Sequence, residues 1–170
     1  MGIGWARGGS LRALGSVPLK NLPFLGIAVL LVLAARAASV PPVLARALLA
    51  AGDLGALIVL WRNRRLPWMP ILFIGLALNT LVMLANGGRM PVTGQVLGLM
   101  ALGSGDPWYT AAGRGTRWAF LGDVLPVRVG VLGAVVSVGD LLMAVGLAGF
   151  VARQMGREAI ARGDGPHVIG

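Results

Sequence analysis

Four long apolar runs constrain this chain more than any other feature. They cover residues 22–38, 43–61, 69–85 and about 131–152. Each run approaches the roughly 17 to 25 residues that a tilted helix needs to cross a bilayer. Because Pro41-Pro42 and the Arg- and Pro-containing stretch 62–67 interrupt the runs, adjacent helices are connected by short turns. We therefore predict an all-α membrane protein with four transmembrane helices, neighbours running antiparallel.

The composition agrees with lipid as the solvent of these runs. The chain is 56% hydrophobic and only 12% charged, whereas charged residues make up about a quarter of a typical soluble domain. It has no cysteine, which excludes disulfides, a thiolate nucleophile and a cysteine-based metal site. No histidine or carboxylate cluster has the spacing of metal ligands, and His167 lies alone in the tail. We expect no cofactor and no metal.

The basic residues predict the orientation of the chain in the membrane. The net charge is +9, and the positive charges form short clusters between the apolar runs. The clusters are Arg7, Arg12 and Lys20; Arg62, Arg64 and Arg65; and Arg153, Arg157 and Arg162. These three clusters share one side only if there are four crossings with both ends in the cytoplasm. We expect a multi-pass protein of the bacterial cytoplasmic (inner) membrane, N-in and C-in. Its expected partner is the lipid bilayer, and we expect it to bind no nucleic acid.

The segment 86–130 is too long and too apolar for a plain loop. Gly and Pro recur through its first half, which argues against a continuous helix. We predict interfacial or re-entrant pieces between helices three and four, with aromatic residues at the outer interface. The chain then has a single transmembrane domain over residues 1–152 and a basic cytoplasmic tail over 153–170.

Two polar residues, Asp53 and Asn79, lie inside predicted spans, where an ionisable group costs a few kcal/mol on insertion scales. Arg46 is seven residues before Asp53 and falls on the same helical face. One interpretation is a buried polar contact of Asp53 with Arg46 or Asn79 that holds helices together. The other is part of a polar pathway through the membrane.

Asp123 and Asp140 are acids flanked by apolar residues, 17 positions apart. The sequence Ser137-Val-Gly-Asp140 fits an N-terminal capping box, and Asp123 fits a turn before Pro126. Alternatively, the intervening turn brings the two carboxyl groups together. Two such carboxyls would share one proton, so that one acts as general base on water and the other as acid.

Asn86-Gly-Gly-Arg89 ends the third run. The motif is typical of a helix C-cap followed by an interfacial arginine. The alternative is a substrate-binding site, since Asn86 offers a donor and an acceptor and Arg89 offers a planar fork for a carboxylate or phosphate. It lacks the GK[ST] ending of a phosphate-binding loop.

The strings LWRNRRLPWMP, ANGGRMPV, FLGDVLP and SVGDLLMAVG occur in that order. They resemble an uncharacterised bacterial family of small polytopic membrane proteins, described only as a domain of unknown function. The resemblance covers about residues 4–152 and implies no activity. The resemblance implies an additional apolar helix at the start of the family, which this chain is expected to lack or to have lost.

The pair FLGDVLP and VVSVGDLLMAVG is also similar, more loosely, to the end of lipoprotein signal peptidase, a four-helix intramembrane aspartyl peptidase. The resemblance implies that Asp123 and Asp140 are the catalytic pair, and that Asn86 and Arg89 match polar residues ending its third helix. The chain departs from that pattern, because Ser137-Val-Gly stands where the peptidase has Asn-x-Ala.

Two functions follow from these observations. We favour a non-enzymatic accessory or structural membrane component, with other membrane proteins as partners. The alternative is an intramembrane aspartyl-dyad hydrolase acting on a lipid-anchored substrate at the outer interface.

Overall fold

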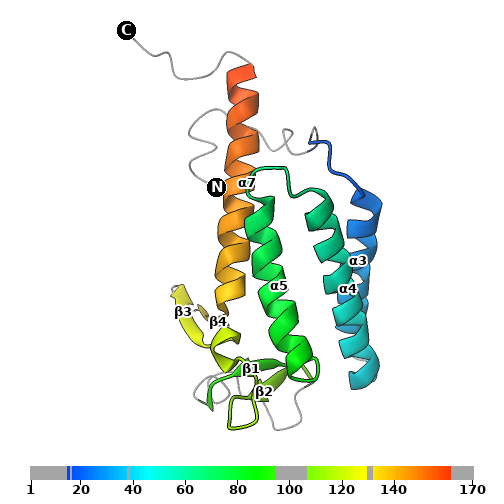
Figure 1. Cartoon of the computed structure of the whole chain (residues 1–170), viewed down its shortest axis with the longest axis vertical. Coiled ribbons are helices and arrows are strands. Elements are labelled where there is room, and N and C mark those ends of the chain that lie inside the picture. The colour runs from blue at the N-terminus through cyan, green and yellow to red at the C-terminus, as the bar shows by residue number, and fades with distance from the viewer. Residues whose placement is uncertain (1–14, 16, 38, 95–106, 130–131, 162–170) are drawn as a thin grey trace.

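The computed structural model describes residues 15, 17–37, 39–94, 107–129 and 132–161, and these residues are mostly helical (Figure 1). The long helices are α3 (Leu22–Ala35), α4 (Pro42–Arg62), α5 (Met69–Ala85) and α7 (Val138–Ala161). The smaller elements are β1 (Met90–Val92), β2 (Tyr109–Ala111), the 3-10 helix η1 (Ala119–Leu121), β3 (Leu125–Val129) and β4 (Leu132–Val136).

The helices pack in chain order, α3 on α4, α4 on α5 and α5 on α7. All the strands lie at one end of the helices, where α5 ends and α7 begins (Figure 1). β1 pairs with β2 in parallel, and β3 pairs with β4 in an antiparallel hairpin. We call β1 to β4 with η1 the β cap.

The structure corrects the predicted fourth helix and confirms the positions of the other three. The third helix has the predicted bounds, the second differs by one residue at each end, and the first ends three residues early at Ala35. The predicted start of the fourth helix at 131 is wrong, because residues 132–136 form strand β4. Apolar residues suit either a strand or a helix, and pairing with β3 decides for the strand. The same helix continues to Ala161, beyond the predicted end at 152.

The described part of the predicted interfacial segment consists of short strands and one 3-10 turn. Residues 95–106 and the tail from 162 onward lie outside the described residues.

Proline and glycine set the helix ends as the sequence predicts. Proline occupies one of the first two positions of α3, α4 and α5, where its missing N–H would be unpaired in any case. After α5, Gly87 adopts φ +70° and the Gly88 N–H donates to the Met83 carbonyl over 2.8 Å. This is a Schellman ending, which confirms the C-cap interpretation of Asn-Gly-Gly.

Glycines let the helix backbones approach closely. At Gly75 of α5, an added Cβ would lie 2.6 Å from the Gly139 carbonyl oxygen of α7. At Gly52 of α4 it would lie 2.8 Å from the Ala28 carbonyl oxygen of α3. Small residues at such crossings are typical of helices that pack in lipid.

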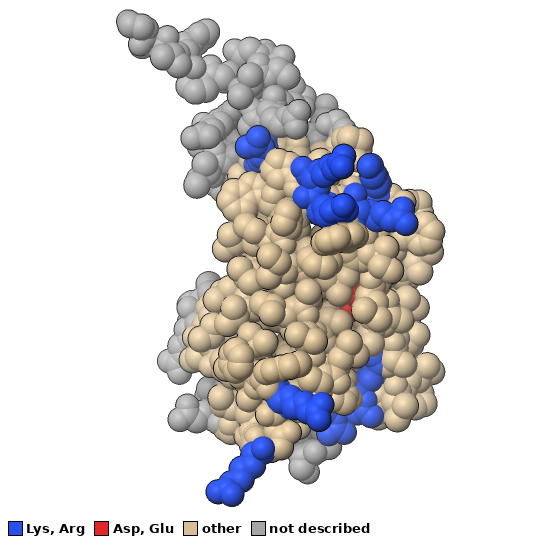
Figure 2. Space-filling view, in the orientation of Figure 1, with Lys and Arg blue, Asp and Glu red and all other residues tan. Residues whose placement is uncertain are grey.

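Two of the helices are long and apolar enough to cross a membrane. These are α4 and the 138–155 part of α7, and only 22% and 28% of their apolar windows are buried. A core helix of a soluble protein would be mostly buried, so the outward apolar surface of both helices suggests membrane association. α3 and α5 are apolar but shorter, at 14 and 17 residues. Lys and Arg gather at the two ends of the face shown in Figure 2, and the band between them shows no Lys or Arg and one small acidic patch.

The α5–α7 crossing provides a test of the packing. An added Cβ at Gly139 would overlap the Asn79 side chain, so we expect Gly139→Ala to destabilise the protein by about 1–3 kcal/mol. Gly26→Ala in α3 is the matched control, because nothing lies within 4 Å of its added Cβ. Thermal unfolding of the purified protein in detergent measures both variants. Equal melting temperatures for the two variants would contradict this packing.

Candidate functional site

A cavity of about 390 Å³ lies where the β cap meets the helices. Its wall combines acids with apolar and aromatic side chains from α3, α4, α5, α7 and the cap. The polar and aromatic lining residues are Arg36, Asp53, Asn79, Trp108, Tyr109, Asp123 and Asp140. We call this cavity the acidic pocket. It contains both acids of the predicted pair and both predicted intramembrane polar residues.

Asp140 closes a capping box at the start of α7. The Ser137 N–H donates to Asp140 Oδ2 over 2.9 Å, and the Asp140 N–H donates to Ser137 Oγ over 2.9 Å. Each residue satisfies an amide that the first helical turn leaves without a partner. The capping-box interpretation of Ser137-Val-Gly-Asp140 is therefore confirmed.

Asn79 connects this box to α5. Its Nδ2 donates to Asp140 Oδ1 over 2.8 Å, and its Oδ1 accepts a hydrogen bond from Ser137 Oγ over 2.8 Å. Asn79 is 7% exposed and Ser137 is fully buried. Since both oxygens of Asp140 accept hydrogen bonds from the fold, the cost of burying this carboxylate is offset.

Asp123 has a different environment. It lies between η1 and β3, where its N–H donates to the Pro91 carbonyl over 2.9 Å and its backbone bridges to Val92 of β1. The side chain is 8% exposed, and Oδ1 has no hydrogen-bond partner among the described residues. Burial, together with the charge of Asp140, raises the pKa of Asp123 to about 7. One acid of the pair thus accepts hydrogen bonds on both oxygens, whereas Oδ1 of the other has no donor among the described residues.

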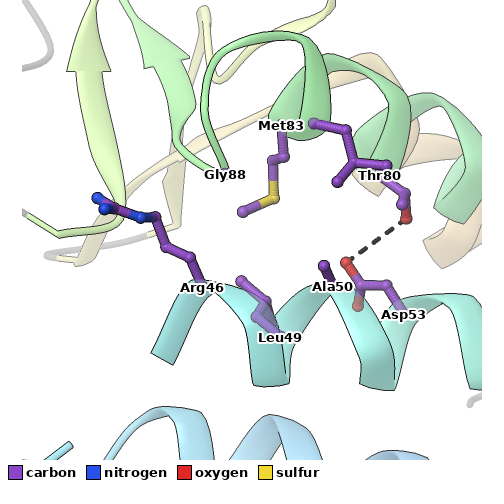
Figure 3. Close-up of a pocket in the computed structure, with 8 residues that line it drawn as sticks. Arg46, Leu49, Ala50, Asp53, Thr80, Met83 and Gly88 are labelled. Atoms are coloured by element: carbon purple, nitrogen blue, oxygen red, sulfur yellow. Dashed lines mark hydrogen bonds between the residues drawn. The ribbon is translucent and has the colours of Figure 1, made fainter. Parts of the chain in front are cut away.

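Asp53 pairs with neither of its predicted partners. On α4 it accepts a long 3.5 Å hydrogen bond from Thr80 Oγ1 of α5, next to Asn79 in the sequence (Figure 3). Figure 3 shows Arg46 extending away from Asp53, and its aliphatic stem packs over Gly88. The space of about 10 Å³ between these side chains has room for roughly one water molecule and is too small for a ligand.

Asn86 holds the β cap onto the end of α5. Its Nδ2 donates to the Arg117 carbonyl over 2.9 Å, and its Oδ1 accepts from the Arg117 N–H over 3.0 Å. Arg89 is half-buried just before β1. Neither Asn86 nor Arg89 is among the residues that line the acidic pocket. The structure therefore brings Asp123 and Asp140 to one cavity, and it does not bring the two predicted substrate-binding residues there.

Three further residues make contacts that the sequence did not predict, two of them in the acidic pocket or beside it and one at the opposite end of the helices. Thr80 is the partner of Asp53, Arg36 stacks 4.6 Å from the Trp108 ring centroid, and Asn63 pairs with the backbone of Lys20. Thr80 beside Asn79 in an apolar run was a detectable signal, because polar residues inside a span need partners. Arg36 and Asn63 meet segments distant in sequence, which local patterns do not indicate. The described residues contain no group of three or more His, Cys, Asp or Glu side chains that could hold a metal ion.

These features define a helical protein with two possible membrane spans and an acidic pocket under a β cap. The chain belongs to DUF5317, a family of unknown function, whose sequence model matches residues 16–152. The expected family resemblance is thereby confirmed. No curated protein and no solved structure matches the chain, so nothing in these comparisons supports the similarity to lipoprotein signal peptidase.

Asp123 gives a pH-dependent prediction. Its pKa is about 7 in the folded protein, raised from the ordinary value of 3.8 that the side chain has in an unfolded chain. Between these two pKa values the folded protein keeps a proton on Asp123 that the unfolded chain loses. The contribution of this proton to the free energy of unfolding is therefore fully present below about pH 4 and is lost as the pH rises through about 7. We expect the melting temperature to fall between about pH 5 and pH 8 in the wild type, and to fall less in Asp123→Asn.

Glu158→Gln is the control, because it removes one carboxylate at the other end of α7. It should keep the wild-type pH dependence. Parallel curves for the wild type and Asp123→Asn would show that Asp123 has an ordinary pKa.

Proposed function

We propose that this chain is a four-span protein of the bacterial cytoplasmic membrane with both termini in the cytoplasm. α3 and α5 have 14 and 17 residues and lie against the two longer helices. At 1.5 Å per residue they are about 21 Å and 26 Å long, somewhat short of a hydrocarbon core of about 30 Å. Local thinning of the bilayer accommodates such short spans at modest cost.

The charge distribution supports this orientation. Arg64 and Arg65 follow α4 directly in the turn to α5, and Asn63 attaches the backbone of Lys20 to that same end. Basic residues in short loops favour the cytoplasmic side. The β cap is at the opposite end, so in this proposal it lies at the outer face of the membrane with the acidic pocket beneath it.

Cysteine labelling tests the topology directly, since the chain has no native cysteine. Leu66→Cys lies in the α4–α5 turn, and Gly115→Cys lies in the cap with open space around it. We expect a membrane-impermeant maleimide to label Gly115→Cys in right-side-out spheroplasts, and Leu66→Cys only after lysis. The reverse pattern would give the opposite orientation, and labelling of both sites before lysis would exclude the four-span arrangement.

We propose further that the protein is a non-enzymatic accessory or structural membrane component. The observation that carries this proposal is the use of both Asp140 oxygens within the capping box and its contact to Asn79. Asn86, a predicted substrate ligand, is likewise used to attach the cap. Two of the four residues predicted for chemistry thus hold the fold together.

An aspartyl-dyad hydrolase is the second candidate. It is favoured by the shared cavity of Asp123 and Asp140 and by the pKa of about 7 for Asp123. A protonated carboxyl beside an ionised one is the arrangement that activates water and protonates a leaving group. Its substrate would be a lipid-anchored peptide at the outer interface.

Ser137 separates the two candidates. If Asp140 acts through the capping box, Ser137→Ala and Asp140→Ala each cost about 1–3 kcal/mol, and the double variant costs less than their sum because the two residues share bonds. Thermal unfolding and the amount of protein in membranes measure this coupling. The hydrolase is supported instead if Asp140→Ala folds as well as the wild type while a lipopeptide that the wild type cleaves stays intact.

A further inference from the structure

We propose that the acidic pocket binds a ligand carrying an ammonium group, with the Asp123 carboxylate as its principal contact. This inference rests on the proposed non-enzymatic role, because it assigns the pocket to binding and not to hydrolysis. The described acids that line the pocket are Asp53, Asp123 and Asp140.

The size and walls of the pocket suit a small organic ligand. Its volume of about 390 Å³ falls in the range of small-molecule sites, about 300–1,000 Å³. Apolar side chains such as Leu76, Val135 and Met143 line it together with the acids. Apolar walls with a few convergent polar groups are typical of ligand sites.

Asp123 is the acceptor that the fold leaves for a ligand. Asp140 already accepts hydrogen bonds from Ser137 and Asn79, and Asp53 accepts one from Thr80. Asp123 is 8% exposed, lines the pocket, and has no partner for Oδ1 among the described residues. A buried acceptor without a hydrogen bond is costly, and since Oδ1 is itself closed to solvent, a donor in the pocket would recover that cost once the Asp123 carboxyl rotates toward it.

The charge and the aromatic lining favour an ammonium group. Three carboxyl groups line the pocket together with the guanidinium of Arg36, which stacks on Trp108. The described acids do not form the close group of three ligands that a metal ion requires. Tyr109 contributes aromatic surface, which attracts organic cations, whereas the Trp108 ring is already stacked by the Arg36 guanidinium.

Binding of a cation should depend on pH through Asp123. The charged or titratable groups around it are Asp140 from α7, Asp53 from α4, Arg36 at the C-cap of α3 and Tyr109 from β2. A bound ammonium stabilises the ionised form of Asp123, so binding below its pKa of about 7 releases a proton. Affinity should therefore rise by about tenfold between pH 6 and pH 8, a range in which alkyl amines stay protonated.

The full chain in phosphatidylglycerol nanodiscs is titrated with ethanolamine by isothermal titration calorimetry. We expect saturable binding that weakens about tenfold in Asp123→Asn, the value of one charge-assisted hydrogen bond, and that loses its pH dependence there. Glu158→Gln should bind like the wild type. Leu76→Trp fills the pocket without changing any charged residue, so it should abolish binding. This second variant tests the proposal even if Asp123→Asn folds poorly.

The ammonium group has two sources, a free amine or a phosphatidylethanolamine headgroup. Native mass spectrometry of protein purified from membranes that contain phosphatidylethanolamine and phosphatidylglycerol separates the two sources. If phosphatidylethanolamine stays bound to the protein and added ethanolamine displaces it, the lipid headgroup is the source. Absence of saturable binding, equal binding by Asp123→Asn, or binding of Mg²⁺ in place of ethanolamine would overturn the inference. The non-enzymatic role is measured independently by the unfolding of the Ser137 and Asp140 variants, so failure of ligand binding and failure of the proposed role are distinguishable.

Discussion

The hydrogen-bonded junction of Ser137, Asp140 and Asn79 is the interaction on which the rest of the structure depends. It fixes the first residue of α7, because Ser137 and Asp140 satisfy each other's backbone amides. It also fixes the register of α7 against α5, since Asn79 reaches both residues while Gly139 packs against Gly75. The strand β4 must end there, and the β cap is consequently held over the helix ends.

The acidic pocket follows from this junction. Placing the half-buried Asp140 at the start of α7 puts a carboxylate next to the cap, where Asp123 is held by its backbone bridge to Val92. Donors offset the burial of Asp140, whereas Asp123 Oδ1 lacks a partner among the described residues. The two acids differ in role because their hydrogen-bond environments differ, and that asymmetry is what makes the pocket a candidate for binding.

Side-chain amides attach the remaining segments to the helix ends. Asn63 at the C-cap of α4 pairs with both backbone groups of Lys20, and Asn86 at the C-cap of α5 does the same with Arg117. A side-chain amide offers an NH2 group with two donors and a carbonyl acceptor in one plane, so it can pair with a backbone N–H and a backbone carbonyl together. The two asparagines thereby attach the irregular segments around Lys20 and Arg117 to opposite ends of the helices, where no continuous sheet among the described residues holds these segments.

The sequence by itself determined the features that depend on neighbouring residues. Apolar runs bounded by proline located α3, α4 and α5, and the spacing of Ser137 and Asp140 predicted their mutual cap. Tertiary structure decided what depends on distant partners. It made residues 132–136 a strand by pairing them with β3, and it gave Asp53 the hydroxyl of Thr80 in place of Arg46. An apolar or acidic residue has several acceptable local environments, and only the packed neighbours select one.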